Sequence, residues 1–409
     1  MELGFLGPLF ERQGPWASVY FDTTTASEDA AARQKLTARS ACDSLKSQGA
    51  DDDTCSAMYD TLVSLPRGAQ LPGRAVFATH GEVVLDTELT VPPPGGGEPL
   101  TSWQTLPRTG PLLELADSDP SCLVAFIDRQ GAEFELRGPV HAYSAGRVTG
   151  SDYPLRRTPT GNWSEGHFQA AVENTWEQNA AEIAEELRVR WDKCGAELLV
   201  LAGDARERNS VYDQLPPDLR ERTFQAEHGV RADSGPDGPA ANTSKGRRLL
   251  EEEITEARET YGRQRSAKVL ERFQAGRAPT DDGRLDAAEG VPALVEAARE
   301  HRIGVLLVRP EGPDNHREVW AGDDPDQIAV RRSEGQYLGA TEPCSVRADD
   351  ALMRSAAATG ADVLRVRPED APEGVPEDLP DGGLGALLRW PYEGAPEGGG
   401  AGGGQHATG

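Results

Sequence analysis

The sequence predicts an α/β protein with three domains and a short tail. The chain has 409 residues, which is enough for roughly two to four domains with hydrophobic cores of their own. Along the chain, apolar runs typical of buried strands alternate with segments of helical period. Stretches rich in glycine and proline separate these runs into groups. The predicted ranges are 1–118 for an N-terminal α/β domain, 119–260 for a middle domain, 261–392 for a C-terminal domain and 393–409 for a disordered glycine-rich tail.

The N-terminal domain is predicted from one strand, two helices and one hairpin. Residues 16–25 are rich in β-branched and aromatic side chains, which favours a strand. Residues 27–45 and 52–65 have helical period, and each run opens with a polar residue that can cap a helix, Ser27 and Asp52. Two strand-like runs within 73–90 meet at His80-Gly81, which predicts a hairpin turn there.

The middle domain is predicted to be a mixed sheet with flanking helices. Its first strand, within 122–138, is almost wholly apolar and is therefore expected at the centre of the sheet, paired with the second strand about a Gln130-Gly131 turn. Residues 142–164 are rich in Gly, Pro and Arg and are predicted to form a loop before a long helix. The later elements are expected to be a strand at 196–204, a helix at 206–215 and a strand at 221–228.

The C-terminal domain is predicted to be an α/β/α sandwich, because helices and strands alternate in it. The domain is expected to begin within or after a helix at 249–276. Its further expected helices are 291–300 and 349–360, and its expected strands are 303–310, 361–368 and 384–391.

Composition limits the possible partners and the compartment. The formal charge of -26 argues against sequence-independent binding to DNA or to anionic membranes, although a local basic patch could still meet RNA. The five cysteines are far apart and form no CxxC pair, which fits a reducing compartment. No segment approaches the roughly 18 apolar residues that a membrane span needs. We expect a cytoplasmic protein with no membrane or DNA partner.

Common catalytic and cofactor motifs are missing from the sequence. It contains no Walker loop, no HExxH and no GxSxG, and its seven histidines are isolated from one another. Asp128 and Glu135 lie on paired predicted strands and Asp204 lies at the end of a third, so a magnesium site is conceivable. Turn and cap formation explains the two aspartates equally well, and we favour it. No catalytic residue, metal or cofactor is therefore predicted.

The most informative segment leads into the long helix. Gly161, Asn162 and Trp163 precede Ser164, a good helix cap. The helix after them has one apolar face, made by Phe168, Val172, Trp176, Asn179, Ile183, Leu187 and Trp191. Arginines upstream make the loop locally basic on an acidic protein. The predicted RNA-contacting residues are Arg147, Arg156, Arg157, Gly161, Asn162, Trp163, Ser164 and His167.

A basic loop with an aromatic tip on a rigid helix suits a narrow space lined by RNA. Arginines can meet phosphates, the indole of Trp163 can stack on bases, and Gly161 avoids steric collisions. The competing interpretation is that Trp163 folds back as a hydrophobic staple on its own helix.

This arrangement resembles the middle domain of the archaeo-eukaryotic class I release factors and of Pelota. In those families a Gly-Gly-Gln loop precedes a Ser-Ala-x-Arg-Phe-like helix start, then come a long helix with an asparagine, a strand ending in glycine, and a helix with Leu-Pro. The matching positions here are Thr160-Gly161-Asn162-Trp163-Ser164, His167-Phe168, Asn179, the strand 196–204 and Gln214-Leu215-Pro216.

The resemblance covers nearly the whole chain and is closest to the bacterial relatives, the group that includes the hibernation factor Balon and its actinobacterial counterparts. It implies a middle domain of the RNase H-like release-factor type and a C-terminal sandwich like a ribosomal protein of the L7Ae type. The sequence departs from the release factors at the tripeptide, where Asn162 is one methylene shorter than glutamine and is followed by Trp163. Efficient ester hydrolysis is therefore not expected. The Asn-Ile-Lys-Ser stop-codon motif is also missing from the first domain.

The resemblance therefore implies a ribosome-binding translation factor that occupies the A site and contacts 23S and 16S rRNA. Its C-terminal domain would meet a translational GTPase, with elongation factor Tu as the bacterial candidate. We expect a hibernation or stress factor without peptide-release activity and not an enzyme. Two alternatives remain open: a rescue factor that hydrolyses peptidyl-tRNA or cleaves tRNA, and an acidic interaction protein with no role at the ribosome.

Overall fold

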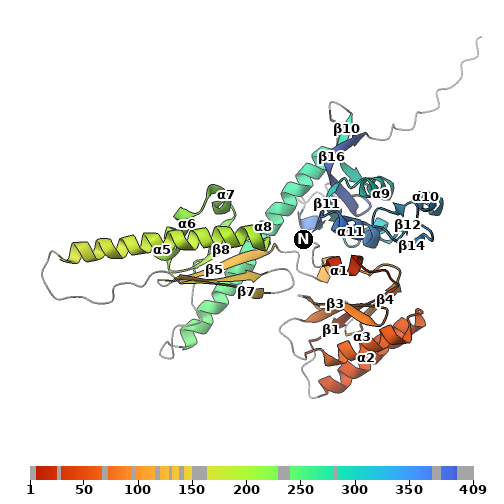
Figure 1. The fold of residues 1–409 in the computed structure, drawn as a ribbon, viewed down its shortest axis with the longest axis horizontal. Coiled ribbons are helices and arrows are strands. Elements are labelled where there is room, and N and C mark those ends of the chain that lie inside the picture. The colour runs from red at the N-terminus through yellow and green to blue at the C-terminus, as the bar shows by residue number, and fades with distance from the viewer. Residues whose placement is uncertain are drawn as a thin grey trace, which may run out of the picture.

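A computed structural model shows the chain as two packed domains with a third extending to one side (Figure 1). It describes residues 6–24, 29–66, 72–89, 91–93, 97–115, 120–128, 131–137, 142–149, 164–228, 240–280, 283–370 and 379–393. Each of its four sheets takes all its strands from one of the three predicted domains. The predicted tail lies outside the described residues, apart from Glu393 at the end of the last strand.

The N-terminal domain has a four-stranded antiparallel sheet in the order β3-β2-β1-β4. Its elements are α1 (Gly7–Phe10), β1 (Trp16–Asp22), α2 (Ala30–Ser47), α3 (Asp52–Ser64), β2 (Gly73–Thr79), β3 (Glu82–Leu89), β4 (Leu100–Gln104) and α4 (Leu112–Leu115). The predicted hairpin is confirmed: His80 and Gly81 both have positive φ, as a tight turn between β2 and β3 requires. The helices α2 and α3 cover one face of the sheet, where Val19, Leu45 and Met58 are fully buried.

The middle domain has the predicted mixed sheet, and its five strands lie in the order β7-β6-β5-β8-β9. Its strands are β5 (Cys122–Asp128), β6 (Gly131–Arg137), β7 (Ala142–Thr149), β8 (Leu198–Gly203) and β9 (Thr223–Gln225), and its helices are α5 (Ser164–Cys194), α6 (Ala205–Gln214) and α7 (Pro217–Arg220). The strand β5 is central, antiparallel to β6 and parallel to β8.

One prediction in this domain is wrong. Residues 142–149, expected to belong to a loop, form the edge strand β7, which pairs antiparallel with β6. Arg147 therefore lies in a strand opposite Glu133. The tyrosine and valine in this segment have strand preference, but its glycine and two alanines concealed it. Pairing with β6 supplies the hydrogen bonds that fix this segment as a strand.

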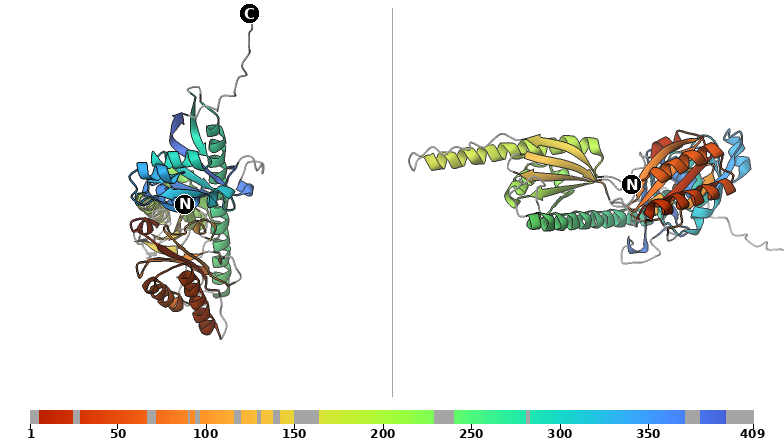
Figure 2. Two further views of the ribbon diagram at one scale, coloured as in Figure 1. Left: turned by 90° about the vertical axis from the view of Figure 1, so that its right-hand side faces the viewer. Right: turned by 90° about the horizontal axis from the view of Figure 1, so that it is seen from below.

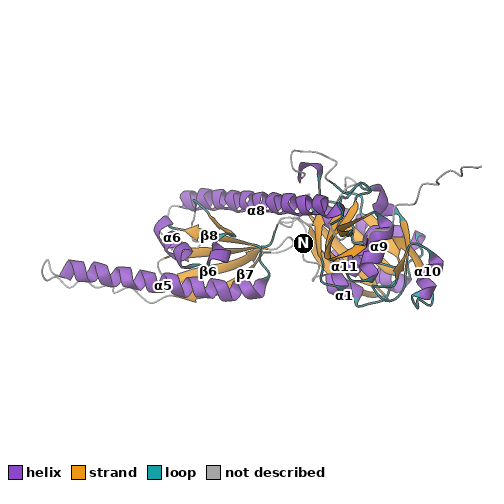
Figure 3. Ribbon diagram, turned by 90° about the horizontal axis from the view of Figure 1, so that it is seen from above, coloured by secondary structure: helices purple, strands orange, loops and turns teal. Residues whose placement is uncertain are grey.

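Helices cover both faces of the middle sheet (Figure 2, Figure 3). On one face α5 and α6 bury Leu123, Phe134 and Leu187 against each other. On the other face lies α8 (Ala240–Arg277), a helix of 38 residues. Its first half packs Leu250 and Ile254 on this sheet, while its last turns continue into the C-terminal domain. The boundary predicted between 260 and 261 therefore falls inside one continuous helix.

The C-terminal domain is the predicted α/β/α sandwich, with a sheet in the order β10-β16-β11-β15. Its elements are β10 (Arg284–Glu289), α9 (Val291–Arg299), β11 (Ile303–Val308), η2 (Pro313–His316), β12 (Glu318–Ala321), β13 (Ile328–Ala329), α10 (Arg332–Tyr337), β14 (Cys344–Arg347), α11 (Ala348–Ala358), β15 (Asp362–Arg365), η3 (Pro368–Asp370) and β16 (Leu384–Glu393). Phe273 of α8 packs on one face, and α9 and α11 pack on the other. A small second sheet, β13-β12-β14, was not predicted.

The second face of the N-terminal sheet is covered by the C-terminal domain. One continuous apolar cluster contains Trp16, Tyr20 and Phe77 from the N-terminal sheet together with Val291 and Leu352 from the C-terminal helices. The short helix α1 contacts both β3 and α11, and its Leu9 is fully buried. The two domains therefore share one hydrophobic core. Among the described residues, no helix is long and apolar enough to cross a lipid bilayer.

Candidate functional site

The C-terminal half of α5 is anchored on the middle sheet. Ile183 and Leu187 are buried, and Asn179 is only 5% exposed, as the predicted apolar face requires. Trp191 packs against the same core. The guanidinium carbon of Arg190 lies 4.7 Å from the centroid of the Phe134 ring. This half of the predicted face is confirmed, and it holds the helix rigidly in one direction.

The N-terminal half of α5 projects beyond the sheet (Figure 1, Figure 3). The helix has 31 residues, which corresponds to about 46 Å. The strand β5 below it has 7 residues, about 23 Å. A helix about twice as long as the strands must extend past them, and it does so on the side away from the other two domains. The start of α5 is thereby carried far from the main body of the protein.

The structure describes only part of the predicted RNA-contacting set. Ser164 is the first residue of α5 and His167 lies in its first turn. Arg147 lies near the end of β7, the edge strand that precedes the loop. The remaining five predicted residues lie outside the described residues: Arg156, Arg157, Gly161, Asn162 and Trp163. Whether the indole points outward or forms a staple therefore stays a prediction.

The direction of α5 favours negative charge at its projecting end. The aligned peptide dipoles of a helix give its N-terminus about half a positive elementary charge. The first N–H groups of a helix also lack partners within the helix, and phosphates commonly accept from them. The end of α5 is thus suited to a phosphate-bearing partner on a protein that is acidic as a whole.

The predicted turn and cap roles of the strand-end aspartates are confirmed. Asp128 Oδ1 accepts from the backbone N–H of Gly131 at 3.0 Å, within the β5–β6 turn. Asp204 caps α6, with Oδ1 accepting from the N–H of Arg206 at 3.0 Å. Glu135 pairs with Arg137, at 2.9 Å. Within the described residues, no group of three or more His, Cys, Asp or Glu residues is arranged to hold a metal ion.

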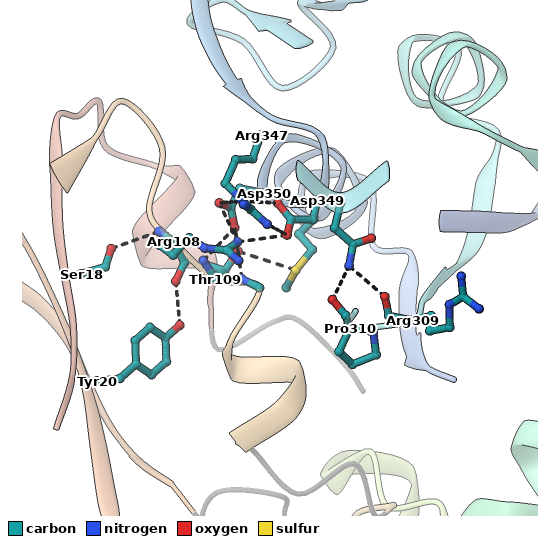
Figure 4. Close-up of polar contacts among 12 residues, drawn as sticks. Ser18, Tyr20, Arg108, Thr109, Arg309, Pro310, Arg347, Asp349 and Asp350 are labelled. Atoms are coloured by element: carbon teal, nitrogen blue, oxygen red, sulfur yellow. Dashed lines mark hydrogen bonds and ion pairs between the residues drawn. The ribbon is translucent and has the colours of Figure 1, made fainter. Parts of the chain in front are cut away.

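A second polar cluster lies buried between the N- and C-terminal domains (Figure 4). Arg108 follows β4, whereas Asp349 and Asp350 are in the first turn of α11. Arg108 Nη1 lies 3.1 Å from Asp349 Oδ2 and 3.0 Å from Asp350 Oδ2. The two carboxylates are 2% and 1% exposed. We call these three residues the interdomain cluster.

Backbone and hydroxyl donors complete the hydrogen bonding of Asp350. Its Oδ1 accepts from the backbone N–H groups of Thr109 at 2.9 Å and Gly110 at 3.1 Å. Arg347 holds Asp349 in a bidentate pair, at 3.0 and 2.7 Å. On the other side, the Tyr20 hydroxyl donates to the Arg108 carbonyl at 2.6 Å. The cluster thus connects the N-terminal sheet directly to α11.

The cluster shifts the pKa of two of its members. The pKa of Asp350 is raised from 3.8 to about 6, mainly because the carboxyl is buried, and further because Asp349 is next to it, while Arg108 opposes the shift. For Arg108, burial acts to lower the pKa, but the charges of Asp350 and Asp349 outweigh it and the pKa is raised. Removing one partner from a buried charge cluster of this kind leaves an uncompensated charge in the interior, which strongly destabilises the fold.

The sequence contains little signal for the interdomain cluster. Arg108 and Asp350 are 242 positions apart. Acidic residues in the first turn of a helix are also common because they favour the helix dipole, so the two aspartates predict a helix start and not burial. Only the packing of the two domains brings the three side chains together.

The middle of the chain matches a known protein family. Residues 121–279, which run from β5 to the end of α8, match the family model described as bacterial archaeo-eukaryotic release factor family 2. The chain is also 27% identical over 384 residues to an uncharacterised protein of Mycobacterium tuberculosis, in the strains CDC 1551 / Oshkosh and H37Rv. That alignment covers 93% of this chain and 95% of the relative.

Several solved structures are similar at low identity. An archaeal translation termination factor is 16% identical, with 93% of each chain covered and a TM-score of 0.23. Pelota of Archaeoglobus fulgidus is 16% identical, with 78% of this chain and 79% of that chain covered and a TM-score of 0.28. A translation termination-like factor of S. cerevisiae is 13% identical, with 78% and 80% covered and a TM-score of 0.33. These TM-scores are low, so the likeness adds nothing to the fold seen directly in Figure 1.

Proposed function

We propose that this chain, a member of the bacterial archaeo-eukaryotic release factor-like family through residues 121–279, binds the ribosome and occupies its A site without catalysing peptide release. The observation that supports this proposal best is the shape of the middle domain. Its long helix is anchored at one end and projects at the other, and the basic Gly-Asn-Trp segment immediately precedes the projecting end. Such a helix can carry a short loop into a narrow space lined by RNA.

Asn162 supports occupancy over hydrolysis. Placing a water molecule against an ester is sensitive to displacements of about 1 Å. A side chain one methylene shorter than glutamine, followed by Trp163, is poorly suited to that placement. The protein would therefore shield idle ribosomes in stress or dormancy in the cytoplasm, with the projecting end of α5 near 23S rRNA and the N-terminal domain toward 16S rRNA. The C-terminal domain would meet a translational GTPase, and elongation factor Tu is the candidate.

Sedimentation with purified 70S ribosomes tests the binding. Arg156→Ala combined with Arg157→Ala should weaken binding by about tenfold or more at moderate salt, because each neutralised phosphate contributes to affinity. Trp163→Ala should weaken it as well, by the loss of a stacking surface. The matched control is Arg247→Ala combined with Arg248→Ala, two adjacent exposed arginines on α8 that lie away from the projecting end of α5. Equal loss in both double variants would contradict a specific role for the loop.

A peptidyl-tRNA release assay separates occupancy from rescue. The wild-type protein should release no more peptide than buffer, and Asn162→Ala should change nothing. Release by the wild type that is lost in Asn162→Ala would establish a hydrolytic rescue factor instead. Addition of the GTPase to the sedimentation assay tests the remaining partner: elongation factor Tu should co-sediment with idle ribosomes in proportion to the amount of this protein bound.

A further inference from the structure

The middle domain has a groove far from the start of α5, between the edge strand β9 and the helix α8. Its volume is about 550 Å³. Phe224 and Tyr261, both half-buried, form part of its floor together with the buried Ala257. Polar residues of α8 at helical spacing line one wall: Glu253, Glu256, Thr260 and Gln264.

The other wall of the groove is an open strand edge. The strand β9 is last in the sheet order and pairs parallel with β8. Leu199 N–H donates to the Arg222 carbonyl at 2.8 Å, and Ala226 N–H donates to the Leu201 carbonyl at 2.9 Å. Since the backbone groups of a strand alternate in direction, those of Thr223 and Gln225 point away from β8. No strand in the described part of the chain pairs with this outer edge.

The groove is strongly acidic. Its lining residues include four glutamates, Glu221, Glu227, Glu253 and Glu256, and one arginine, Arg222. At one end the His228 ring nitrogen Nδ1 lies 2.6 Å from Glu253 Oε1, so this carboxylate already has a neighbour. The other three glutamates are exposed at the rim. An open strand edge beside aromatic side chains and carboxylates has the features of a site for adding a basic strand.

We propose that this groove binds an extended, lysine- or arginine-rich segment of a partner protein, which pairs with β9 as a sixth strand of the middle sheet. The backbone of the segment bonds to Thr223 and Gln225. Its apolar side chains lie over Phe224 and Tyr261, and its basic side chains meet the glutamates at the rim. This proposal stands on the groove itself and not on the function of α5, so ribosome binding through the loop and peptide binding in the groove can fail independently.

The test uses the full-length protein and a fluorescent nine-residue peptide of alternating lysine and valine, whose binding is measured by fluorescence anisotropy. Gln225→Pro removes the outward N–H and leaves the bonds to β8 in place, because proline is tolerated on the outer side of an edge strand. Its matched control is Gln225→Ala, which removes the side-chain bond from Arg208 Nε, at 3.1 Å, but keeps the N–H. The proline variant should bind at least about tenfold more weakly than the alanine variant.

A second pair of variants tests the charges at the rim. Glu227→Gln with Glu256→Gln should weaken the lysine peptide by about threefold to tenfold and reduce its dependence on salt, as expected for exposed ion pairs. Glu252→Gln with Glu259→Gln makes the same change in net charge on residues that do not line the groove, and it should change binding less than about twofold. The same peptide with N-methylated amides along one edge should not bind the wild type, which tests strand pairing without altering the protein.

Three results would overturn the proposal. The first is no binding of the lysine peptide to the wild type. The second is equal binding by the proline and alanine variants, which would indicate charge attraction without strand pairing. The third is binding that appears only after residues 229–239 are replaced by a short Gly-Ser linker, since the groove would then belong to the chain's own segment. Tight binding that requires both the N–H of Gln225 and the rim carboxylates supports the proposal.

Discussion

The N-terminal and middle domains are joined to the C-terminal domain by junctions of different kinds. The N-terminal junction is a shared apolar core with the interdomain cluster buried inside it. The middle junction is a single helix, α8, which carries the partly buried Arg265. Arg265 Nη1 lies 2.5 Å from Glu197 of the middle domain, and Arg265 Nη2 lies 3.4 Å from Asp362 of the C-terminal domain.

Because of this difference, the N- and C-terminal domains form one unit, and the middle domain is a second unit joined to it by α8. A junction that buries apolar area and charged partners is costly to open, because every part of it must return to water. A junction made of one helix and partly exposed ion pairs is held chiefly by the stiffness of the helix. The domain with the projecting α5 is the one held in this second way. Its direction can therefore adjust to a partner while the N- and C-terminal domains move as one unit.

The largest expected effect comes from breaking the buried junction. Arg108→Ala leaves Asp349 and Asp350 buried with one partner fewer, and it should lower the free energy of unfolding by about 3–5 kcal/mol. Urea denaturation followed by tryptophan fluorescence measures it. The control is Arg12→Ala, which removes an exposed pair with Glu82 and should lower the free energy of unfolding far less. Similar costs for the two variants would mean that the cluster does not hold the domains together.

An intermediate effect is expected from pH. Because the pKa of Asp350 is raised in the folded protein, the folded state binds a proton more readily than the unfolded state. The stability from this group is therefore fully present below its unfolded pKa, near 3.8, and is lost as the pH rises through about 6. Asp350→Asn removes this dependence. The wild type should gain about 2 kcal/mol relative to the variant between pH 7 and pH 4, measured by denaturation at each pH.

Glu82 provides a control for the sign of this pH effect, because its pKa is shifted in the opposite direction. The pKa of Glu82 is lowered, first by its hydrogen bond with Arg12 and then by the charge of Arg12. Its contribution to stability is therefore present above its unfolded pKa and is lost as the pH falls. Glu82→Gln should give a small slope of the opposite sign. A wild-type-minus-variant difference for Asp350→Asn that also decreases toward low pH would contradict the burial of that carboxyl.

The smallest effect on stability is expected at the middle junction. Arg265→Ala should change the free energy of unfolding by no more than about 1 kcal/mol, because its partners are partly exposed. The same change should broaden the range of directions that the middle domain adopts, seen as a shift in the small-angle X-ray scattering profile. Arg188→Ala, whose partners Glu185 and Asp192 lie on the same helix, should leave the profile unchanged.

The sequence by itself determined the order and type of most elements. Buried strands such as 122–128 and 198–203 are continuous apolar runs, and helices such as α5 repeat apolar residues at three or four positions. Both signals are local, since they depend on residues within one or two turns or one strand. The turn at His80-Gly81 and the caps at Asp128 and Asp204 are local for the same reason, and they too were predicted.

The tertiary structure decided what depends on residues far apart in the chain. The strand β7 exists because β6 lies beside it, and no periodic pattern in 142–149 indicates that neighbour. The interdomain cluster exists because the second face of the N-terminal sheet needs an apolar cover, which α1 and the C-terminal domain supply. The hydrophobic pattern of a strand or helix predicts that one of its faces is buried, but it does not predict which other surface covers that face. Whole domains must pack before Arg108 meets Asp350.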